Sequence, residues 1–382
     1  MGHATLPTPS QPANPHPMNI HGLLPEGLRD RLPPQAQALA SLVRTLTDVC
    51  AAHGYERVAP PLIEYEASLA SGSSRERLRF TDPVSQMTLA LRSDITGQVG
   101  RIAVTRLAAQ ARPLRLMYAG QVLRVRGDQL SPERERTQAG AELIGSDGPA
   151  AAAELLQLAI AALATAGVTG LSVDLTMPTL VADLAAAGWP LGRASLAQVQ
   201  ALLDGKDIGA LKALGADAYV PLIAAAGPVQ AAIAALKQLD LPDSVLDRLD
   251  NIAGLAAGLD GVNVTLDPTE RHGFEYQTWL GFSLFGSGLA AELGRGGAYA
   301  VARADGSSEP AIGFSLYVDG LVDLGLGVEP QRRILLPLGT PPAEATALRH
   351  DGWITVAALD ADASAAALGC GHVWQAGRAV PA

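Results

Sequence analysis

The residues best suited to metal or thiol chemistry are the cysteines and the histidine nearest to one of them. The chain has two cysteines, Cys50 and Cys370, which lie too far apart in sequence to indicate a disulfide framework or a metal-binding spacing. The pair Cys370 and His372 offers two ligands at most, whereas a protein zinc site needs three or four. We therefore predict no metal site and no cofactor.

A glycine-rich run, Gly294-Arg-Gly-Gly297, is the segment that most resembles a phosphate-binding loop. It lacks the full spacing of either common nucleotide-binding fingerprint. Glycine also tolerates backbone conformations that other residues avoid. We interpret the run as a tight turn between two strands.

Two acidic residues stand at positions where they can either support the fold or face a ligand. Asp94 precedes a helical pattern, where an Asp commonly caps the first turn. Glu142 lies in a strand-like segment, where the alternative to a ligand-binding role is a solvated side chain. Both carboxylates can also accept hydrogen bonds from a bound molecule.

The elements that must position these residues follow from hydrophobic periodicity and from turn residues. Helical spacing covers 33–53, 94–111 and 150–166, with Gly54 and Gly167 directly after the first and third of these segments. Strand patterns fall at 55–58, 89–92, 114–125, 138–144, 168–175, 262–266, 276–285 and 311–318. The charged segment 126–137 is predicted to be a long hairpin loop.

Strands come in runs and helices are grouped elsewhere, which favours an α+β fold with an antiparallel sheet over a doubly wound one. Residues 1–17 are rich in Pro, Thr, Ser and Asn and are expected to be a disordered tail. A core domain is expected over 18–328, with a helical insertion at about 179–258. A strand, a helix and a strand at 334–336, 343–350 and 353–357 predict a small C-terminal αβ domain over 329–382.

The net charge and hydropathy of the chain limit the kinds of partner that it can be expected to bind. The net charge is −10 and the pI is about 5.2, which disfavours binding to a nucleic-acid backbone. No apolar run is long enough to span a membrane, and no signal-peptide pattern opens the chain. We expect a cytoplasmic protein.

Four segments, in order, resemble the class II aminoacyl-tRNA synthetases and specifically the histidyl enzyme. The first, 54–64, is similar to the end of motif 1, and the second is Leu91-Arg-Ser-Asp-Ile-Thr96. The third combines Leu123-Arg-Val-Arg126 with Gln138-Ala-Gly-Ala-Glu142 and resembles motif 2. The fourth runs from Asp267 through His272-Gly-Phe-Glu-Tyr276 and Gly294–Tyr299 to Phe314, and resembles the histidine-specific segments and motif 3. The resemblance covers about 22–324.

The resemblance implies a class II synthetase fold, a dimer formed through motif 1, and a histidine pocket. Asp94, Thr96 and Gln138 would accept hydrogen bonds from the ammonium group. Glu142 and Tyr276 would lie near the imidazole, and Arg124 would hold the carboxylate, because a guanidinium binds it at two points. His272 would stand where the family has an arginine.

The chain departs from the family where the adenylation reaction needs positive charge. The histidine-specific arginine falls on His272, and the arginine of motif 3 falls on Gly320. Arg271 is one residue away, so in an extended segment it would point to the opposite face. Too few residues follow Gly325 for the family's anticodon-binding domain.

This pattern resembles the regulatory subunit of short-form ATP phosphoribosyltransferase, a catalytically inactive relative of the synthetase. The resemblance implies a homodimer within a larger hetero-oligomer with the short catalytic subunit, in the first step of histidine biosynthesis. It also implies L-histidine as a ligand and a role in feedback inhibition, with no catalytic residue of its own. Two alternatives stay open, namely a synthetase paralogue that adenylates or transfers an amino acid, and an RNA-binding module.

Overall fold

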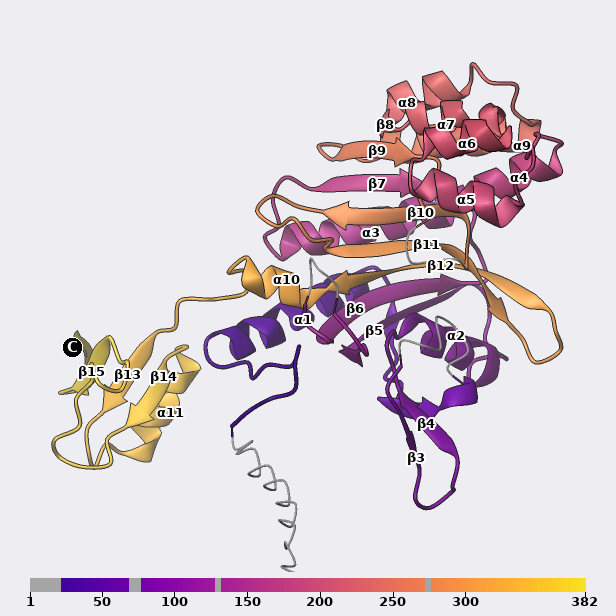
Figure 1. Cartoon of the computed structure of the whole chain (residues 1–382). Coiled ribbons are helices and arrows are strands. Elements are labelled where there is room, and N and C mark those ends of the chain that lie inside the picture. Colours follow the sequence, from indigo (N-terminus) through magenta and orange to yellow (C-terminus); the bar gives the residue numbers. More distant parts are fainter. Residues whose placement is uncertain (1–21, 69–76, 128–131, 272–275) are drawn as a thin grey trace, which may run out of the picture. The chain divides into compact units, whose positions relative to one another are not determined.

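A computed structural model of the chain describes residues 22–68, 77–127, 132–271 and 276–382, which form two units, one up to Leu326 and one from Gly327 to Ala382 (Figure 1). The first unit is built on a nine-stranded sheet in the order β1-β5-β6-β12-β11-β10-β7-β9-β8. Only β1–β5 and β7–β9 pair in parallel among these described strands. The predicted α+β class is confirmed. The strands are β1 (Glu56–Arg57), β5 (Leu114–Leu123), β6 (Glu135–Ile144), β7 (Ser172–Thr176), β8 (Gly227–Pro228), β9 (Asn263–Asp267), β10 (Gln277–Phe285), β11 (Gly294–Ala302) and β12 (Ser308–Tyr317).

Helices cover both faces of this sheet (Figure 1). Helices α1 (Gln35–Ala52) and α3 (Pro149–Thr165) pack on one face, and α2 (Thr96–Thr105) packs on the other. Side chains alternate between the faces along each strand. On β6, Ala139, Ala141 and Leu143 join the α1–α3 core, whereas Ile144 joins the α2 core. The residues of even number on β6, Glu142 among them, therefore face α2. Helix α10 (Val318–Asp323) directly follows β12.

A small antiparallel sheet, β2-β4-β3, extends from the region of α2 (Figure 1). It consists of β2 (Ile63–Tyr65), β4 (Thr88–Leu91) and β3 (Arg79–Thr81), and the short helix η1 (Glu66–Ser68) follows β2. Several apolar side chains of this sheet and its hairpin are exposed, including Ile63, Tyr65, Phe80, Val84 and Met87.

The helical insertion forms its own layer at one end of the sheet, beyond β7 and β9 (Figure 1). Its helices are α4 (Leu180–Ala186), α5 (Leu196–Asp204), α6 (Ile208–Leu214), η3 (Asp217–Tyr219), α7 (Val220–Ala224), α8 (Val229–Leu236) and α9 (Asp243–Ala257). Gly205 and Gly215 cap the C-terminal ends of α5 and α6. Gly227 opens the two-residue strand β8, which pairs with β9.

The second unit is a four-stranded sheet in the order β14-β13-β15-β16, with one helix packed on it. It contains β13 (Arg333–Leu336), α11 (Pro342–His350), β14 (Ile354–Ala357), β15 (His372–Gln375) and β16 (Arg378–Pro381). Strands β13, β14 and β15 run parallel, and β16 is antiparallel. The sequence patterns predicted β13, α11 and β14 but missed β15 and β16.

Helix α2 ends at Thr105, so it is shorter than the predicted helix over 94–111. The guanidinium of Arg112 donates to the backbone oxygens of Ala103, Leu107 and Gln110 at 2.8–3.1 Å. The contact with Ala103 satisfies a carbonyl group at the end of the helix, and the other two contacts hold the turns that follow it. Strand β6 begins at Glu135, inside the predicted hairpin loop. The predicted tail lies outside the described residues.

The interpretation of 294–297 as a turn was wrong, because these residues begin β11, in the middle of the sheet. Their glycines make room for neighbouring side chains. A Cβ atom on Gly296 would lie 2.4 Å from the ring of Phe282, which belongs to the α1–α3 core. The sequence pattern was misread because close packing and tight turns both select glycine.

Candidate functional site

The central residue of the candidate site is Glu142, a carboxyl group with no exposed surface on the α2 face of β6. Tyr299 on β11 donates to its Oε2 at 2.9 Å, and the Tyr118 hydroxyl on β5 lies within donating distance of its Oε1 at 3.2 Å. The interpretation of Glu142 as a solvated strand residue is therefore wrong. A buried carboxyl group of this kind is costly unless it serves a partner.

Burial raises the pKa of Glu142 to about 8, although the hydrogen bond from Tyr299 acts in the opposite direction. The negative charge of Asp94 adds to the increase. Burial, followed by the proximity of Glu142, also raises the pKa values of Tyr118 and Tyr299 well above their ordinary range. Both hydroxyl groups consequently stay protonated and remain available as donors.

A second network joins the N-terminus of α2 to the sheet. The amide of Gln138 donates from Nε2 to Asp94 at 2.8 Å and also to the Ser315 hydroxyl, and its Oε1 accepts from the backbone N–H of Ile95 at 3.1 Å. Asp94 in turn accepts from the backbone N–H of Thr96 at 2.8 Å. Asp94 thus holds the first turn of α2 and contacts Gln138 at the same time.

The floor of the site is a row of glycines that runs across three adjacent strands. Gly281 on β10 stands opposite Gly297 on β11, which stands opposite Gly313 on β12, and Gly313 stands opposite Glu142. A Cβ atom on Gly313 would lie 1.6 Å from the Glu142 carboxylate, and one on Gly297 would lie 2.6 Å from the Gln277 amide. Only glycine leaves space above the sheet at these points.

A small pocket opens over the part of this row formed by Gly297 and Gly313. Its polar lining includes side chains from α2, β6, β11 and β12, and from the residue before β10; they are Thr96, Glu142, Tyr276, Arg295, Tyr299 and Ser315. The rings of Tyr276 and Tyr299 meet edge to face, with 5.9 Å between centroids. The pocket can therefore accept hydrogen bonds at Glu142 and offers a guanidinium group at Arg295.

The structure brings together most of the residues proposed from the sequence. Thr96, Glu142 and Tyr276 line the pocket, and Asp94 and Gln138 form the network beside it. Arg124 is not among the described lining residues; its backbone pairs with Arg134 after the end of β5. The site residue His272 lies outside the described residues.

The sequence reasoning missed four polar residues of the site: Tyr118, Arg295, Tyr299 and Ser315. Each lies on a strand and faces α2, so each shares the period of two that places Glu142 there. Arg295 had a visible signal, since it is a charged residue inside a run of small residues. Because that run was interpreted as a turn, the alternation of side chains along a strand was not applied to it, and Arg295 was not identified.

The positions where the family has further arginines carry no comparable group here. Gly320 lies in α10, and a Cβ atom there would meet Leu289 at 3.0 Å. Arg271 lies with its Nε 3.9 Å from Asp204 on α5, on the side of the helical insertion. Among the residues that the structure describes, no group of three or more His, Cys, Asp or Glu could hold a metal ion.

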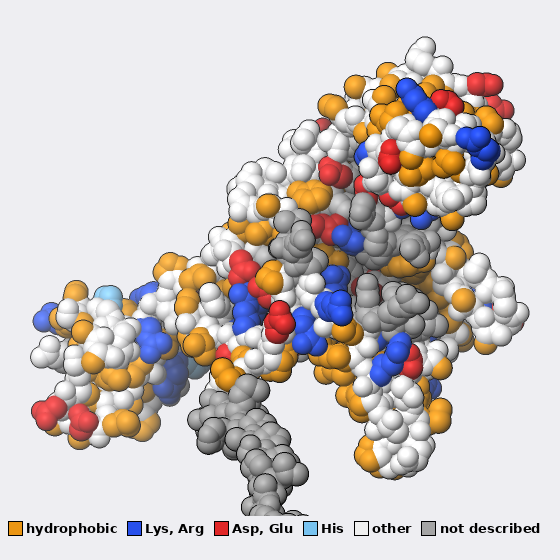
Figure 2. All heavy atoms as spheres, in the orientation of Figure 1, with side chains coloured by type: hydrophobic (Ala, Val, Ile, Leu, Met, Phe, Trp, Pro, Cys, Tyr) orange, Lys and Arg blue, Asp and Glu red, His pale blue; other side chains and the backbone are white. Residues whose placement is uncertain are grey.

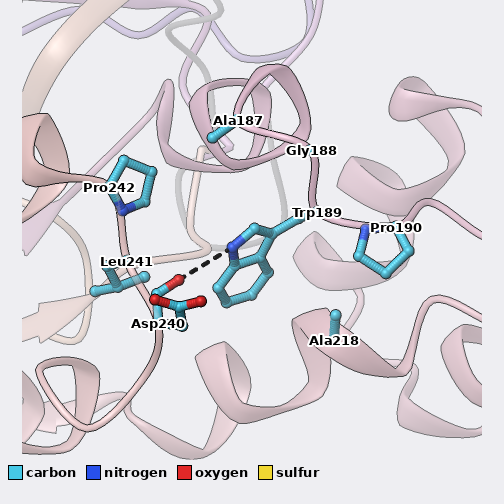
Figure 3. Close-up of a pocket in the computed structure, with 8 residues that line it drawn as sticks. All are labelled: Ala187, Gly188, Trp189, Pro190, Ala218, Asp240, Leu241 and Pro242. Carbon is cyan, nitrogen blue, oxygen red and sulfur yellow. Dashed lines mark hydrogen bonds between the residues drawn. The ribbon is translucent and has the colours of Figure 1, made fainter.

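A larger hollow, of about 540 Å³, lies within the helical insertion (Figure 3). Trp189 forms one wall; its indole N–H donates to the backbone oxygen of Asp240 at 3.3 Å, and its ring packs against Tyr219. Prolines and small side chains form most of the remaining wall. This hollow contains none of the residues that the sequence singled out, so the smaller pocket is the candidate functional site.

Comparison with known proteins agrees with this geometry. The family model described as histidyl-tRNA synthetase matches residues 27–321. A regulatory subunit of ATP phosphoribosyltransferase from Rhodospirillum centenum is 49% identical over 371 residues, 93% of this chain and 95% of its own. The protein of the same name from Rhodospirillum rubrum is 45% identical over 365 residues, 92% and 94% of the two chains.

Solved structures show the same fold. A protein from Bacillus halodurans, described as an ATP phosphoribosyltransferase regulatory subunit/histidyl-tRNA synthetase, has a TM-score of 0.76 at 24% identity and covers 93% of this chain and 97% of its own. Histidyl-tRNA synthetase from Nostoc has a TM-score of 0.70 at 15% identity, with coverage of 92% and 90%. No helix in the described parts of the chain is long and apolar enough to cross a membrane. From its sequence relatives, and in agreement with its synthetase-like fold, the chain belongs to the family of ATP phosphoribosyltransferase regulatory subunits.

Proposed function

We propose that this protein activates a short catalytic subunit of ATP phosphoribosyltransferase and binds L-histidine in the Glu142 pocket as a feedback signal. The observation that carries the proposal is Glu142 itself, fully buried and hydrogen-bonded by tyrosines in a chain of this regulatory family. A protonated or neutral imidazole supplies an N–H donor that an oxygen of Glu142 can accept. The protein supplies no catalytic group of its own, does not adenylate histidine, and acts in the cytoplasm.

The physical route to activation is a shift of the catalytic subunit toward its competent conformation. The size of that shift equals the difference in binding free energy of this subunit for the two conformations of its partner. Histidine opposes the shift when it binds more tightly to the less active assembly, and the coupling is reciprocal.

The test is phosphoribosyl-ATP formation by the catalytic subunit, with and without this protein, over a histidine titration. Turnover should rise when the protein is added. Glu142→Ala should keep that activation and shift the histidine response by about tenfold or more, since leaving a buried hydrogen-bonding group without its partner costs about 1–3 kcal/mol. Glu135→Ala removes an exposed carboxylate from the same strand and should leave the response unchanged.

Each outcome of this assay decides one part of the proposal. Failure of the unmodified protein to activate would refute the regulatory role. Activation with the same histidine response in Glu142→Ala and the unmodified protein would refute only the pocket as the sensor. Glu142→Gln, which keeps the shape of the side chain, separates loss of the carboxyl group from loss of packing.

We also propose a homodimer formed through the segment that ends at Pro61 and the small sheet beside it. Leu62, Ile63 and Tyr65 are 39–47% exposed. Figure 2 shows apolar side chains at several separate places on the protruding small sheet. Exposed apolar groups of this kind commonly mark interaction surfaces.

Sedimentation of the unmodified protein at micromolar concentration should give a dimer, and Ile63→Asp should give a monomer because a buried charge at the interface has no partner. Leu359→Asp is the matched control, since Leu359 is 92% exposed in the second unit and should leave the dimer intact. A monomer for the unmodified protein would contradict the dimer, and a dimeric Ile63→Asp variant would place the interface elsewhere.

A further inference from the structure

The Glu142 pocket has a second charged side chain that the sequence reasoning did not assign. Arg295 lines the pocket from β11. It stands two residues before Gly297 and four before Tyr299, so all three share the face of the sheet that carries Glu142. The pocket therefore carries a hydrogen-bonded carboxyl group and a guanidinium group over one floor.

The spacing of these two groups follows from the register of the sheet. Gly297 and Glu142 lie in one lateral row, with β12 between their strands. Arg295 stands two residues along β11 from that row, roughly 7 Å at the usual rise of a strand, and two strand spacings add roughly 10 Å across the sheet. The Cα atoms of Arg295 and Glu142 are thus roughly 12 Å apart, and both residues line the pocket. Their two groups match a small ligand with a donor at one end and an anion at the other.

The head group of Arg295 is oriented before any ligand arrives. Glu292 accepts from its Nε at 2.7 Å and also from its Nη2, and the hydroxyl of Ser283 on β10 donates to the other oxygen of Glu292. Both contacts with Glu292 lie along one edge of the guanidinium. An arginine has five N–H donors in a fixed plane, so one guanidinium can serve several acceptors at once.

Arg124, which the sequence suggested as the partner of the carboxylate, lies elsewhere. Arg124 follows β5 and is not among the described residues that line the pocket. Its backbone N–H and C=O both pair with Arg134, which places it at the hairpin that leaves the sheet. Arg295, by contrast, lines the pocket together with Gly297.

We propose that Arg295, rather than Arg124, recognises the carboxylate of the bound amino acid. This proposal rests on the proposed function, because it takes the imidazole of histidine as the group that meets Glu142. It makes the pocket specific for the free amino acid over molecules that share the imidazole and lack the carboxylate. Arg295 is thus the residue that makes the pocket select L-histidine over L-histidinol and histamine.

The test is calorimetric titration of the full chain with L-histidine, L-histidinol and histamine. The unmodified protein should bind histidine at least tenfold more tightly than the other two ligands. Arg295→Met should weaken histidine binding by ten- to a hundredfold and leave histidinol binding within about threefold, because only histidine has the carboxylate. Arg295→Lys keeps the charge without the planar fork and should give an intermediate loss.

Two control variants define what would overturn the proposal. Arg303→Met removes one positive charge directly after the same strand and should keep the preference of the unmodified protein. Arg124→Met should also keep it; a loss of preference in Arg124→Met but not in Arg295→Met would assign the role to Arg124 and overturn the proposal. Equal weakening of all three ligands in both Arg295 variants would show a packing role and overturn it as well.

The same titration separates this proposal from the proposed function. Histidine binding with an unchanged preference in Arg295→Met rejects only the role of Arg295. No binding of any ligand by the unmodified protein rejects the histidine pocket and the role of Arg295 together. Activation of the catalytic subunit is measured in the separate turnover assay and does not depend on either result.

Discussion

No histidine-dependent exchange of pyrophosphate into ATP is expected from this protein. Adenylation concentrates negative charge on the α-phosphate in the transition state, and enzymes stabilise that charge with preorganised cations. By resemblance to the histidyl enzyme, two of those cations are missing at positions 272 and 320. The loss of one such contact reduces a rate by about a hundredfold, so two losses predict a reduction of about 10⁴-fold.

Neither Gly320 nor the neighbouring Arg271 offers a simple replacement for these cations. Gly320 lies where an added Cβ atom would meet Leu289 at 3.0 Å, so an arginine cannot be introduced there without moving that side chain. Arg271 lies 3.9 Å from Asp204 on α5. The exchange assay needs an active histidyl-tRNA synthetase as its positive control. A rate within tenfold of that control would show that the chain retains synthetase chemistry.

Thermal stability should fall as pH rises from about 6 to 9, and Glu142→Gln should remove much of that fall. The pKa of Glu142 is about 8 in the folded protein, against an ordinary value of 4.5. A group whose pKa is raised by folding contributes stability that is complete below the unfolded pKa and is lost as pH rises through the folded pKa. The effect is on the order of 4 kcal/mol between pH 5 and pH 9, at about 1.4 kcal/mol for each unit of pKa difference.

The measurement is the melting temperature of the full chain in buffers across this range. Glu142→Gln stays neutral, so it should melt several degrees above the unmodified protein at pH 9 and near it at pH 6. Glu309→Gln is a control in which folding lowers, rather than raises, the pKa of the substituted carboxyl group. Burial would raise the pKa of Glu309, but hydrogen bonds from Arg112 and Arg303 outweigh it and hold the pKa below its usual range. That variant should be less stable at every pH tested, and parallel curves for Glu142→Gln and the unmodified protein would refute the role assigned to Glu142.

Many of the strands and helices could be predicted from the sequence because periodicity and turn residues act locally. The hairpin formed by β5 and β6, helix α3 and the helices of the insertion all follow from such patterns. The short end of α2 could not be predicted, since it depends on Arg112 reaching back to three carbonyl groups. Strands β15 and β16 have four residues each, too few for an alternating pattern to show.

The candidate site was predicted where the resemblance supplied residues, and missed where only the tertiary structure does. Glu142 was named from a motif, but its complete burial follows from strands β5, β11 and β12 meeting around it. Tyr299 lies 157 residues further along the chain, and no local signal links the two. Arg295 was hidden because its glycine neighbours suggested a turn. Contacts between distant strands therefore define the pocket more than any segment of sequence does.

The row formed by Gly281, Gly297 and Gly313 also limits how this pocket can evolve. Any substitution at a glycine adds at least a Cβ atom, and at each of these positions that atom would lie within 2.6 Å of another group. Point mutations on the floor can thus fill the pocket but cannot enlarge it. A lineage that adapts this subunit to a bulkier effector has to change the walls, at positions such as Thr96 or Ser315, while the three glycine codons stay fixed.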